Sequence, residues 1–193
     1  MIDAVIEKAK ERLKGHAKRF KHTEGVAQTA YALAVCHDVD PIKAMMAGYY
    51  HDVAKYDSIE DQTRFLDPIW VETYQAYPVL YHAFAAACYL QLDFQVSDPE
   101  ILDAIRYHVW GRPQMSVLEK IIFVSDSCEP NRGFDECPSI FELAKIDLDQ
   151  AVEICMKISI DVLIQKNKKP SQEQLEAYLY YKEENRAKNK HHH

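Results

Sequence analysis

Four histidines and two aspartates of this chain are of the types that bind transition metals in proteins. Apart from one adjacent pair they are separated by 18 to 30 residues, and they are His22, His51, Asp52, His82, His108 and Asp126. Imidazole nitrogens and carboxylate oxygens suit iron, manganese, zinc, cobalt or nickel. About four ligands close a tetrahedral site, whereas six residues with one bridging carboxylate can hold two ions about 3.5–4 Å apart. The inventory therefore favours two metal ions over one.

The adjacent pair His51 and Asp52 lies in an apolar stretch that reads GYYHDVAKYD. Burying an imidazole and an ionised carboxylate is costly unless a cation or several hydrogen-bond donors replace the lost water. Asp126 ends the apolar segment KIIFVSDS, where an acid opposes the helix dipole. We expect metal ions to offset both costs. His16 and His37 we interpret instead as exposed or as hydrogen-bonded core residues.

The elements that must position these residues are predicted to be helices. The chain has five glycines, and segments with the two-residue alternation of strands are hard to find. Asp-Pro pairs at 40–41, 67–68 and 98–99 are typical helix starts, and Ser116 and Ser171 each begin a capping box. The predicted helices cover residues 2–14, 23–37, 41–55, 68–76, 81–92, 98–108, 116–128, 138–146, 147–167 and 171–186. We therefore predict an all-α fold, a single compact helical bundle over residues 1–190, with residues 191–193 as the remnant of a purification tag.

Composition narrows the classes of partner. The formal net charge of −7 argues against a general nucleic-acid-binding surface, because phosphate backbones need a basic face. No apolar run approaches the ~20 residues of a membrane span, and the amino terminus lacks the apolar core of a secretory signal. Five scattered cysteines are typical of a reduced, cytoplasmic protein. The oligomeric state stays open, with a homodimer as one candidate.

The order His22, His51-Asp52, Asp126 resembles the H…HD…D signature of HD-domain phosphohydrolases. The resemblance narrows to the YqeK family, which it follows from about Arg19 to Tyr181. It is carried by the segments KRFKHTEGVAQTA, AGYYHDVAKY, AIRYHVWGRPQMSVLEKIIFVSDSCEPNR, KIDLDQAV and EAYLYY. The usual family pattern is changed at Ala83, at Val109-Trp110 and at Ser127-Cys128, which bears on the shape of the nucleoside pocket. The resemblance implies an HD-type helical bundle that cleaves diadenosine tetraphosphate symmetrically to two ADP.

The resemblance also implies roles for individual residues. The family's metal ligands correspond to the six residues above, in a dinuclear centre that usually contains iron. One ion would be held by His22, His51, Asp52 and Asp126, and the second by His82 and His108, with Asp52 bridging. The ions would lower the pKa of a bound water, so that hydroxide is available to attack an inner phosphorus and ADP leaves.

Four cations are candidates for binding the substrate phosphates. Lys55 follows Asp52 by three residues, and Arg112 follows His108 by four, so each is tied to a ligand by a short spacing. Arg132 lies in the loop that follows Asp126, and Arg19 lies in the segment that leads to His22. We expect catalytic roles for Asp52, Lys55 and Arg112, and substrate binding by Lys55, Arg112, Arg132 and Arg19. Trp110 could stack on a base or pack in the core.

Three other interpretations compete with this one. Another HD-domain phosphohydrolase could act on deoxynucleoside monophosphates or on guanosine polyphosphates, and a single-metal nucleotidase would not need His82 and His108. A non-catalytic module could bind a nucleotide without turning it over. A purely structural helical protein would require the six ligand-type residues to coincide in spacing by chance.

Overall fold

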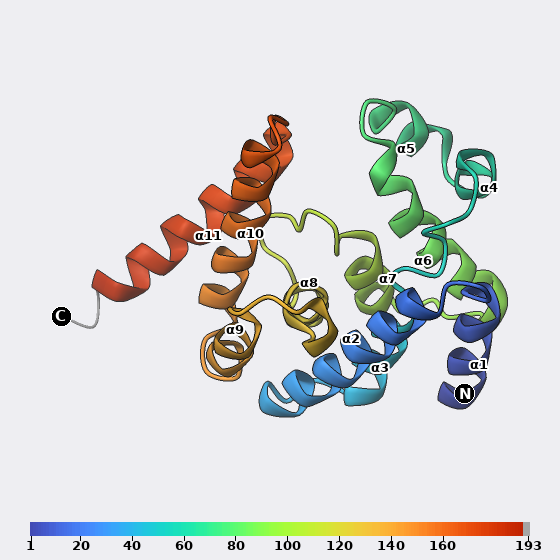
Figure 1. Ribbon diagram of the computed structural model, residues 1–193, viewed down its shortest axis with the longest axis horizontal. Helices are drawn as coiled ribbons and strands as arrows, with labels where there is room; N and C mark the ends of the chain where they lie inside the picture. Colours follow the sequence, from blue (N-terminus) through green and yellow to red (C-terminus); the bar gives the residue numbers. More distant parts are fainter. Residues whose placement is uncertain (191–193) are drawn as a thin grey trace.

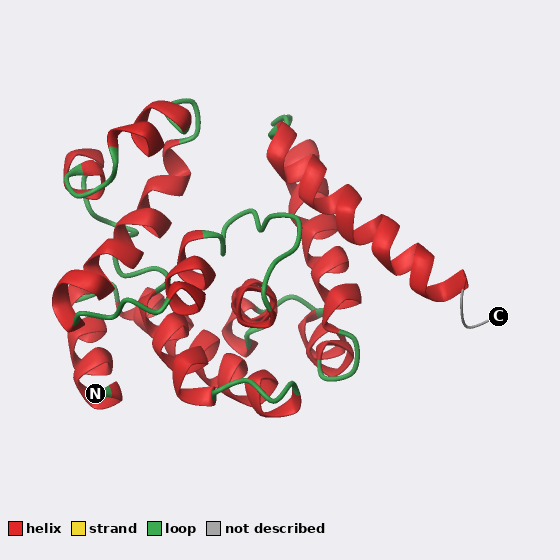
Figure 2. Ribbon diagram, turned by 180° about the vertical axis from the view of Figure 1, so that it is seen from behind, coloured by secondary structure: helices red, strands yellow, loops and turns green. Residues whose placement is uncertain are grey.

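The computed structural model describes residues 1–190, so the three histidines assigned to a tag remnant lie outside the described residues. Within that range every regular element is a helix, which confirms the predicted all-α class (Figure 2). None of these helices is long and apolar enough to cross a membrane. The elements are α1 (Ile2–Arg12), α2 (Ala17–Cys36), α3 (Pro41–Tyr50), α4 (Ile59–Thr63), α5 (Pro68–Thr73), η1 (Pro78–Leu80), α6 (Tyr81–Phe94), α7 (Pro99–Arg106), α8 (Val117–Cys128), η2 (Pro130–Arg132), α9 (Cys137–Ala144), α10 (Leu148–Gln165) and α11 (Gln172–Lys190).

Helix α8 lies at the centre of the arrangement (Figure 1). It packs against α2, α3 and α7 on one side and against α9 and α10 on the other. Helix α11 packs along α10. The short helix α4 packs against α6, on the side of the molecule away from α10 (Figure 1). The apolar core follows these contacts, with wholly buried residues such as Leu33, Leu90 and Ile122. Helix α8 therefore connects the group formed by α2, α3 and α7 with the group formed by α9 and α10.

The helix starts follow the predicted caps. The side chains of Asp40, Asp67 and Asp98 each accept a hydrogen bond from the backbone two residues on, ahead of α3, α5 and α7. Ser116 and Glu119 close the expected capping box of α8. The box at Ser171 also forms, because its hydroxyl accepts from the Gln174 N–H. These local signals fix where the ligand-bearing helices begin.

Two predicted helix boundaries near the candidate ligands are wrong. Helix α2 begins at Ala17 rather than at 23, directly after a break at Gly15, whose φ of +90° favours glycine, so His22 lies inside the helix. Helix α3 ends at Tyr50 rather than at 55. Its end has a chemical cause: the His51 Nδ1 donates to the Gly48 carbonyl, the acceptor that the next backbone N–H would use in a continuing α-helix.

The short helix α4 has no counterpart in the prediction. Its start carries the usual signals, since the Ser58 hydroxyl accepts from the Asp61 N–H and Glu60 and Asp61 occupy the first turn. Five residues are too few to show helical periodicity, and this is why the pattern of apolar residues did not reveal it.

Glycine permits the close contact between α2 and α3. A Cβ at Gly48 would lie 2.7 Å from the Cα of Ala27, well inside van der Waals contact. The two backbones can therefore approach more closely here than any other residue would allow. This contact brings His22, on α2, and His51, at the end of α3, to one point, with their rings 5.4 Å apart.

Candidate metal centre

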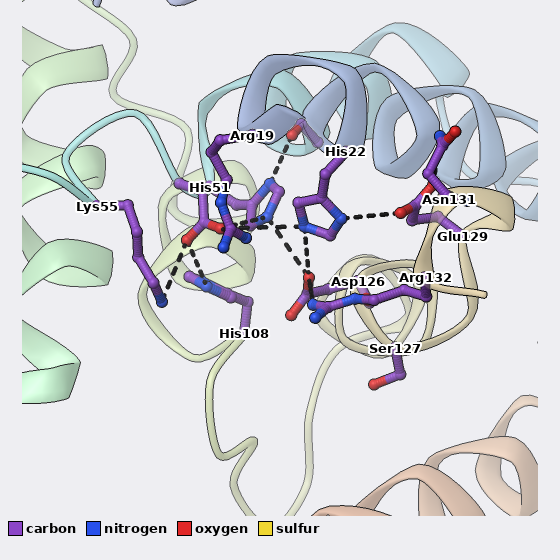
Figure 3. A network of polar contacts seen from close by, with 12 residues as sticks. Arg19, His22, His51, Lys55, His108, Asp126, Ser127, Glu129, Asn131 and Arg132 are labelled. Atoms are coloured by element: carbon purple, nitrogen blue, oxygen red, sulfur yellow. Dashed lines mark hydrogen bonds and ion pairs between the residues drawn. The ribbon is translucent and has the colours of Figure 1, made fainter. Parts of the chain in front are cut away.

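The structure brings the six predicted ligands together from five separate elements. Figure 3 shows His22, His51, His108 and Asp126 among them. They come from α2, the end of α3, α6, the turn after α7, and α8. Their side-chain donor atoms form three overlapping groups, each with all its donors within 4.8 Å of one another. These groups are His22–His51–Asp52, His51–His108–Asp126 and Asp52–His82–His108.

Asp52 lies between two sets of imidazoles and turns one oxygen to each. Its Oδ1 lies 3.0 Å from His82 Nε2 and 3.6 Å from His108 Nε2. Its Oδ2 lies 3.4 Å from His51 Nε2 and 3.9 Å from His22 Nε2. The side chain is 3% exposed. A carboxylate in this position can serve two cations at once, one through each oxygen.

Asp126 completes the side of the centre that contains His22. Its Oδ1 lies 3.0 Å from His22 Nε2 and 3.7 Å from His51 Nε2. One position therefore has two imidazoles and two carboxylates around it. The other, next to His82 and His108, has two imidazoles and the single carboxylate of Asp52. The second position leaves more of a metal's coordination free for a ligand.

All four imidazoles present Nε2 to the centre and use Nδ1 elsewhere. Nδ1 of His51, His82 and His108 lies 2.6–2.7 Å from the backbone carbonyls of Gly48, Val79 and Ile105, respectively. Nδ1 of His22 lies 3.0 Å from the Glu129 carboxylate. Because carbonyl and carboxylate oxygens can only accept, each Nδ1 carries a proton, and in the neutral form of each ring the Nε2 lone pair is directed inward. Such outer contacts are typical of metal-binding histidines.

Both carboxylates of the centre are held in the ionised form. Burial opposes ionisation of Asp52, but the attraction of His51 and the contacts to His108 and His82 hold its pKa well below the usual range. Burial likewise opposes ionisation of Asp126, and the charge of Arg132 with the contacts to His22 and His51 holds that pKa well below its usual range. The two carboxylates create a negative potential that favours cations.

The imidazoles respond to the same surroundings in opposite directions. Burial lowers the pKa of His82 to about 4, and Asp52 only partly offsets it, so this ring is neutral and able to coordinate. Burial also works against the charged form of His51, but the attraction of Asp52 and Asp126 prevails and raises its pKa to about 9. The potential of the carboxylates is therefore strongest around His51.

The donor set fits a transition-metal centre. The lone pair of His82 Nε2 faces the ionised Oδ1 of Asp52 at 3.0 Å, and the repulsion between these two acceptors favours a cation beside them, a place that the Lys55 ammonium takes at 3.1 Å and 3.7 Å. Among residues 1–190, the buried Nε2 atoms of His22 and His51 and the Asp52 Oδ1 have no hydrogen-bond partner. Leaving one such group unsatisfied costs about 1–3 kcal/mol. Coordination of metal ions would satisfy all three atoms.

Three of the four predicted phosphate-binding cations lie at the centre (Figure 3). Lys55 donates to His82 Nε2 at 3.1 Å and lies 3.7 Å from Asp52 Oδ1. Arg19 donates to Asp52 Oδ2 at 2.8 Å, and Arg132 pairs with the Asp126 carboxylate. Each cation is partly exposed, so each can also contact a bound anion.

The structure does not bring Arg112 to the ligand cluster. Its guanidinium donates to Glu119 at 2.7 Å and to Asp103 at 3.1 Å, and it lies over the ring of Tyr107. The short spacing from His108 suggested a common location, but the chain turns at Gly111, which has φ +69°. Beyond that turn, Glu119 and Asp103 both bind the guanidinium and hold it away from the cluster. Trp110, just before it, packs edge-on against Tyr77.

A cavity of about 830 Å³ opens beside the centre. His108, Asp126 and Arg132 line it on the side of the candidate centre, and Lys168 and Lys169 line it from the loop that follows α10. Its apolar walls come from aromatic and aliphatic side chains, including Tyr77, Trp110, Phe134, Ile158 and Val162. An apolar cavity of this size with a few charged groups is typical of a small-molecule site.

Glu129, Lys168 and Lys169 were not predicted from the sequence. Glu129 is wholly buried, yet it precedes a proline in a loop, where an acid is usually exposed to solvent. Lys168 and Lys169 are exposed residues of a polar loop. Their position beside the cavity depends on how α10 packs on α8, which no local pattern reveals.

Comparison with known proteins gives a consistent family. The HD domain family model matches residues 19–131. The chain is 39% identical over 160 residues to a symmetrical bis(5'-nucleosyl)-tetraphosphatase of Bacillus subtilis (strain 168), covering 82% of this chain and 85% of that one. It is 38% identical over 164 residues to a protein of the same name from Halalkalibacterium halodurans, covering 83% and 88% of the two chains.

A solved structure has the same fold over nearly its whole length. It is the crystal structure of a predicted HD superfamily hydrolase involved in NAD metabolism from Clostridium acetobutylicum, with a TM-score of 0.81 and 30% sequence identity. The match covers 92% of this chain and 97% of that one. The family match, the two relatives and the shared fold agree with the geometry of the centre. The chain therefore belongs to the HD-domain hydrolases, in the family of the symmetrical bis(5'-nucleosyl)-tetraphosphatases.

Proposed function

We propose that this protein is a metal-dependent phosphohydrolase that cleaves diadenosine tetraphosphate and related dinucleoside polyphosphates symmetrically. One water is added across the central phosphoric anhydride of diadenosine tetraphosphate, and two ADP result. The position of Asp52 carries the proposal, because each of its oxygens faces a different pair of imidazoles. The relatives named above are the second line of support.

The centre is proposed to hold two divalent transition-metal ions. His22, His51 and Asp126 would hold one, His82 and His108 the other, and Asp52 would bridge them. When bound, the ions supply a lowered pKa for water and neutralisation of phosphate charge. We take iron as the native metal from the family resemblance, and the donor set equally suits manganese, zinc, cobalt or nickel.

The protein's own groups position the substrate. Lys55 and Arg132 flank the centre and would bind phosphate oxygens, which places an inner phosphorus beside Asp52. Arg19 holds the Asp52 carboxylate in its bridging orientation and can contact a phosphate from the same side. Little covalent chemistry is required of the chain, because phosphoryl transfer depends mainly on positioning and charge. Arg112 stays a predicted phosphate ligand that would have to leave Glu119 and Asp103.

The cavity beside Asp126 is proposed to take one nucleoside with its phosphates. Its aromatic and aliphatic walls suit a purine and ribose, and Trp110 could stack on the base. Lys168 and Lys169 add positive charge that a tetraphosphate would attract, in a chain of net charge −7. A mononucleotide would leave part of this positive surface without a partner.

The alternative enzymes differ from this proposal in metal number and in product. A single-metal nucleotidase would not need His82 and His108, so one tightly held ion per chain would favour it. A nucleotide-binding module would hold ADP or GDP without forming product.

We further propose that residues 1–190 form one domain, active in the cytoplasm with its five cysteines reduced. A homodimer stays a prediction, which light scattering would test.

Removal of metal provides the experiment that tests the proposed function. The chain treated with chelator and shown to be empty by metal analysis should release ADP from diadenosine tetraphosphate at least about 100-fold more slowly than the loaded chain. Addition of Fe²⁺ or Mn²⁺ should restore the rate. The proposal is overturned if the empty chain produces ADP as fast as the loaded one.

A further inference from the structure

One of the four histidines at the centre has a different outer partner from the rest. His51, His82 and His108 each donate Nδ1–H to a neutral backbone carbonyl. His22 donates instead to the carboxylate of Glu129, at 3.0 Å. A carboxylate withdraws the Nδ1 proton more strongly than a carbonyl does, so it makes Nε2 a stronger metal ligand.

Glu129 is buried and is held by contacts to His22, Asn131 and Gly25. Its side chain is 0% exposed, and its Oε2 accepts from the Asn131 backbone N–H at 2.7 Å and from Asn131 Nδ2 at 2.8 Å. On the remaining side it lies against α2 at Gly25, where a Cβ would come within 2.1 Å of Oε2. Both oxygens accept hydrogen bonds, one from His22 and the other from Asn131 (Figure 3). The space for the carboxylate exists only because residue 25 has no side chain.

We propose that Glu129 is a positioning residue that makes the two metal positions unequal. It strengthens and orients His22, so that the position shared by His22, His51 and Asp126 binds its ion tightly. The position at His82 and His108 binds more weakly and exchanges its ion. This inference rests on the dinuclear centre of the proposed function, and it adds a difference in affinity that the ligands alone do not define.

The charges around the two positions support the same order. The tight position has the carboxylate oxygens of Asp52 and Asp126 beside it and Glu129 behind it. The weak position has one carboxylate oxygen, and the ammonium of Lys55 lies 3.1 Å from its ligand His82. Lys55 opposes a cation there, and a phosphate bound by Lys55 would relieve that opposition.

Glu129→Gln is the informative substitution. An amide keeps the size of the side chain but offers one acceptor oxygen in place of two. If the glutamine NH₂ faces His22, the imidazole must move its proton from Nδ1 to Nε2 and can no longer coordinate through Nε2. If the NH₂ faces Asn131 instead, two donors oppose each other there. Asn131→Ala removes the side-chain Nδ2 contact to Oε2 while leaving the backbone N–H contact and the bond to His22. Glu153→Gln is the matched control, because Glu153 accepts from Asn185 Nδ2 at 2.8 Å between α10 and α11.

Titration of the emptied chains with Co²⁺, followed by absorbance and by competition with a chelator, measures both positions. Wild type should show a tight and a weak phase. Glu129→Gln should weaken the tight phase by about 10- to 100-fold and leave the weak phase unchanged. Asn131→Ala and Glu153→Gln should stay within about threefold of wild type, well short of that loss. All variants share residues 191–193, so any Co²⁺ bound there is common to them.

Two results overturn the inference. One is an unchanged tight phase in folded Glu129→Gln, and the other is an equal loss in Asn131→Ala, which would assign the effect to the loop. If Glu129→Gln does not fold, Gly25→Ala displaces the same carboxylate from the side of α2 and must weaken the tight phase alone. A wild type that binds Co²⁺ in this order but releases no ADP would overturn the proposed function and leave the inference standing.

Discussion

Asp52→Asn is expected to lower kcat/KM for diadenosine tetraphosphate by at least about 1,000-fold, or about 4 kcal/mol of transition-state stabilisation. The amide is isosteric but neutral, and only one of its two terminal atoms can coordinate a cation. Of the two imidazoles at the second position, His82 would then have no carboxylate in the ligand groups of residues 1–190, and His108 would keep only Asp126. The expected cause is loss of the second ion, so metal content should fall together with the rate.

The chain supplies its own matched control for this substitution. His37 and Asp38 repeat the same dipeptide in an exposed turn after α2, where His37 bonds to the Ala144 carbonyl. Asp38 has φ 54°, a conformation that asparagine tolerates, so Asp38→Asn should leave rate and metal content unchanged. If Asp52→Asn keeps both ions and the wild-type rate, Asp52 is not the bridge.

Lys55→Met is expected to lower kcat by about 100- to 1,000-fold, with a smaller rise in KM. The methionine keeps the length of the apolar stem but removes the ammonium next to Asp52 Oδ1. Charge on the phosphate oxygens grows as the bond to the leaving ADP breaks, so a cation there acts more on the transition state than on binding. Initial rates over a range of substrate concentrations separate the two effects.

Lys21→Met is the control for the lysine substitution. Lys21 is exposed on α2, next to His22 in the sequence. That variant should keep a rate close to that of wild type. Metal content should be unchanged in both variants, because neither lysine is a ligand. A Lys55→Met enzyme with wild-type kcat would remove Lys55 from the mechanism, and one that loses metal would make it a support for His82.

The clustering of the ligand-type residues could be predicted from sequence because residue type carries most of the information. An imidazole or carboxylate in an apolar helical segment needs a partner wherever the helix packs, so His51, Asp52 and Asp126 stood out without knowledge of the fold. The caps at Asp40 and Ser116 were equally readable, since their hydrogen bonds span two or three residues. Signals that act within one helical turn survive in the sequence.

Features that depend on distant partners could not be predicted. Glu129 becomes part of the centre only because α2 carries Gly25 opposite it, more than a hundred positions earlier. Arg112 has the right spacing from His108, yet Glu119 and Asp103 bind it after the chain turns. The end of α3 was misjudged because the His51 side chain competes for a backbone carbonyl. In the first two cases a tertiary contact overrides a local pattern, and in the third a side-chain hydrogen bond to a carbonyl three residues earlier does.

Product analysis tests the central claim most directly. The metal-loaded chain would be incubated with diadenosine tetraphosphate, and the nucleotides formed would be separated and quantified from the earliest time points. We expect two ADP for each substrate consumed, without ATP or AMP, because the proposed centre acts on the inner anhydride. ATP and AMP in equal amounts would contradict the symmetrical cleavage, and the absence of any product from the loaded chain would contradict the enzyme itself.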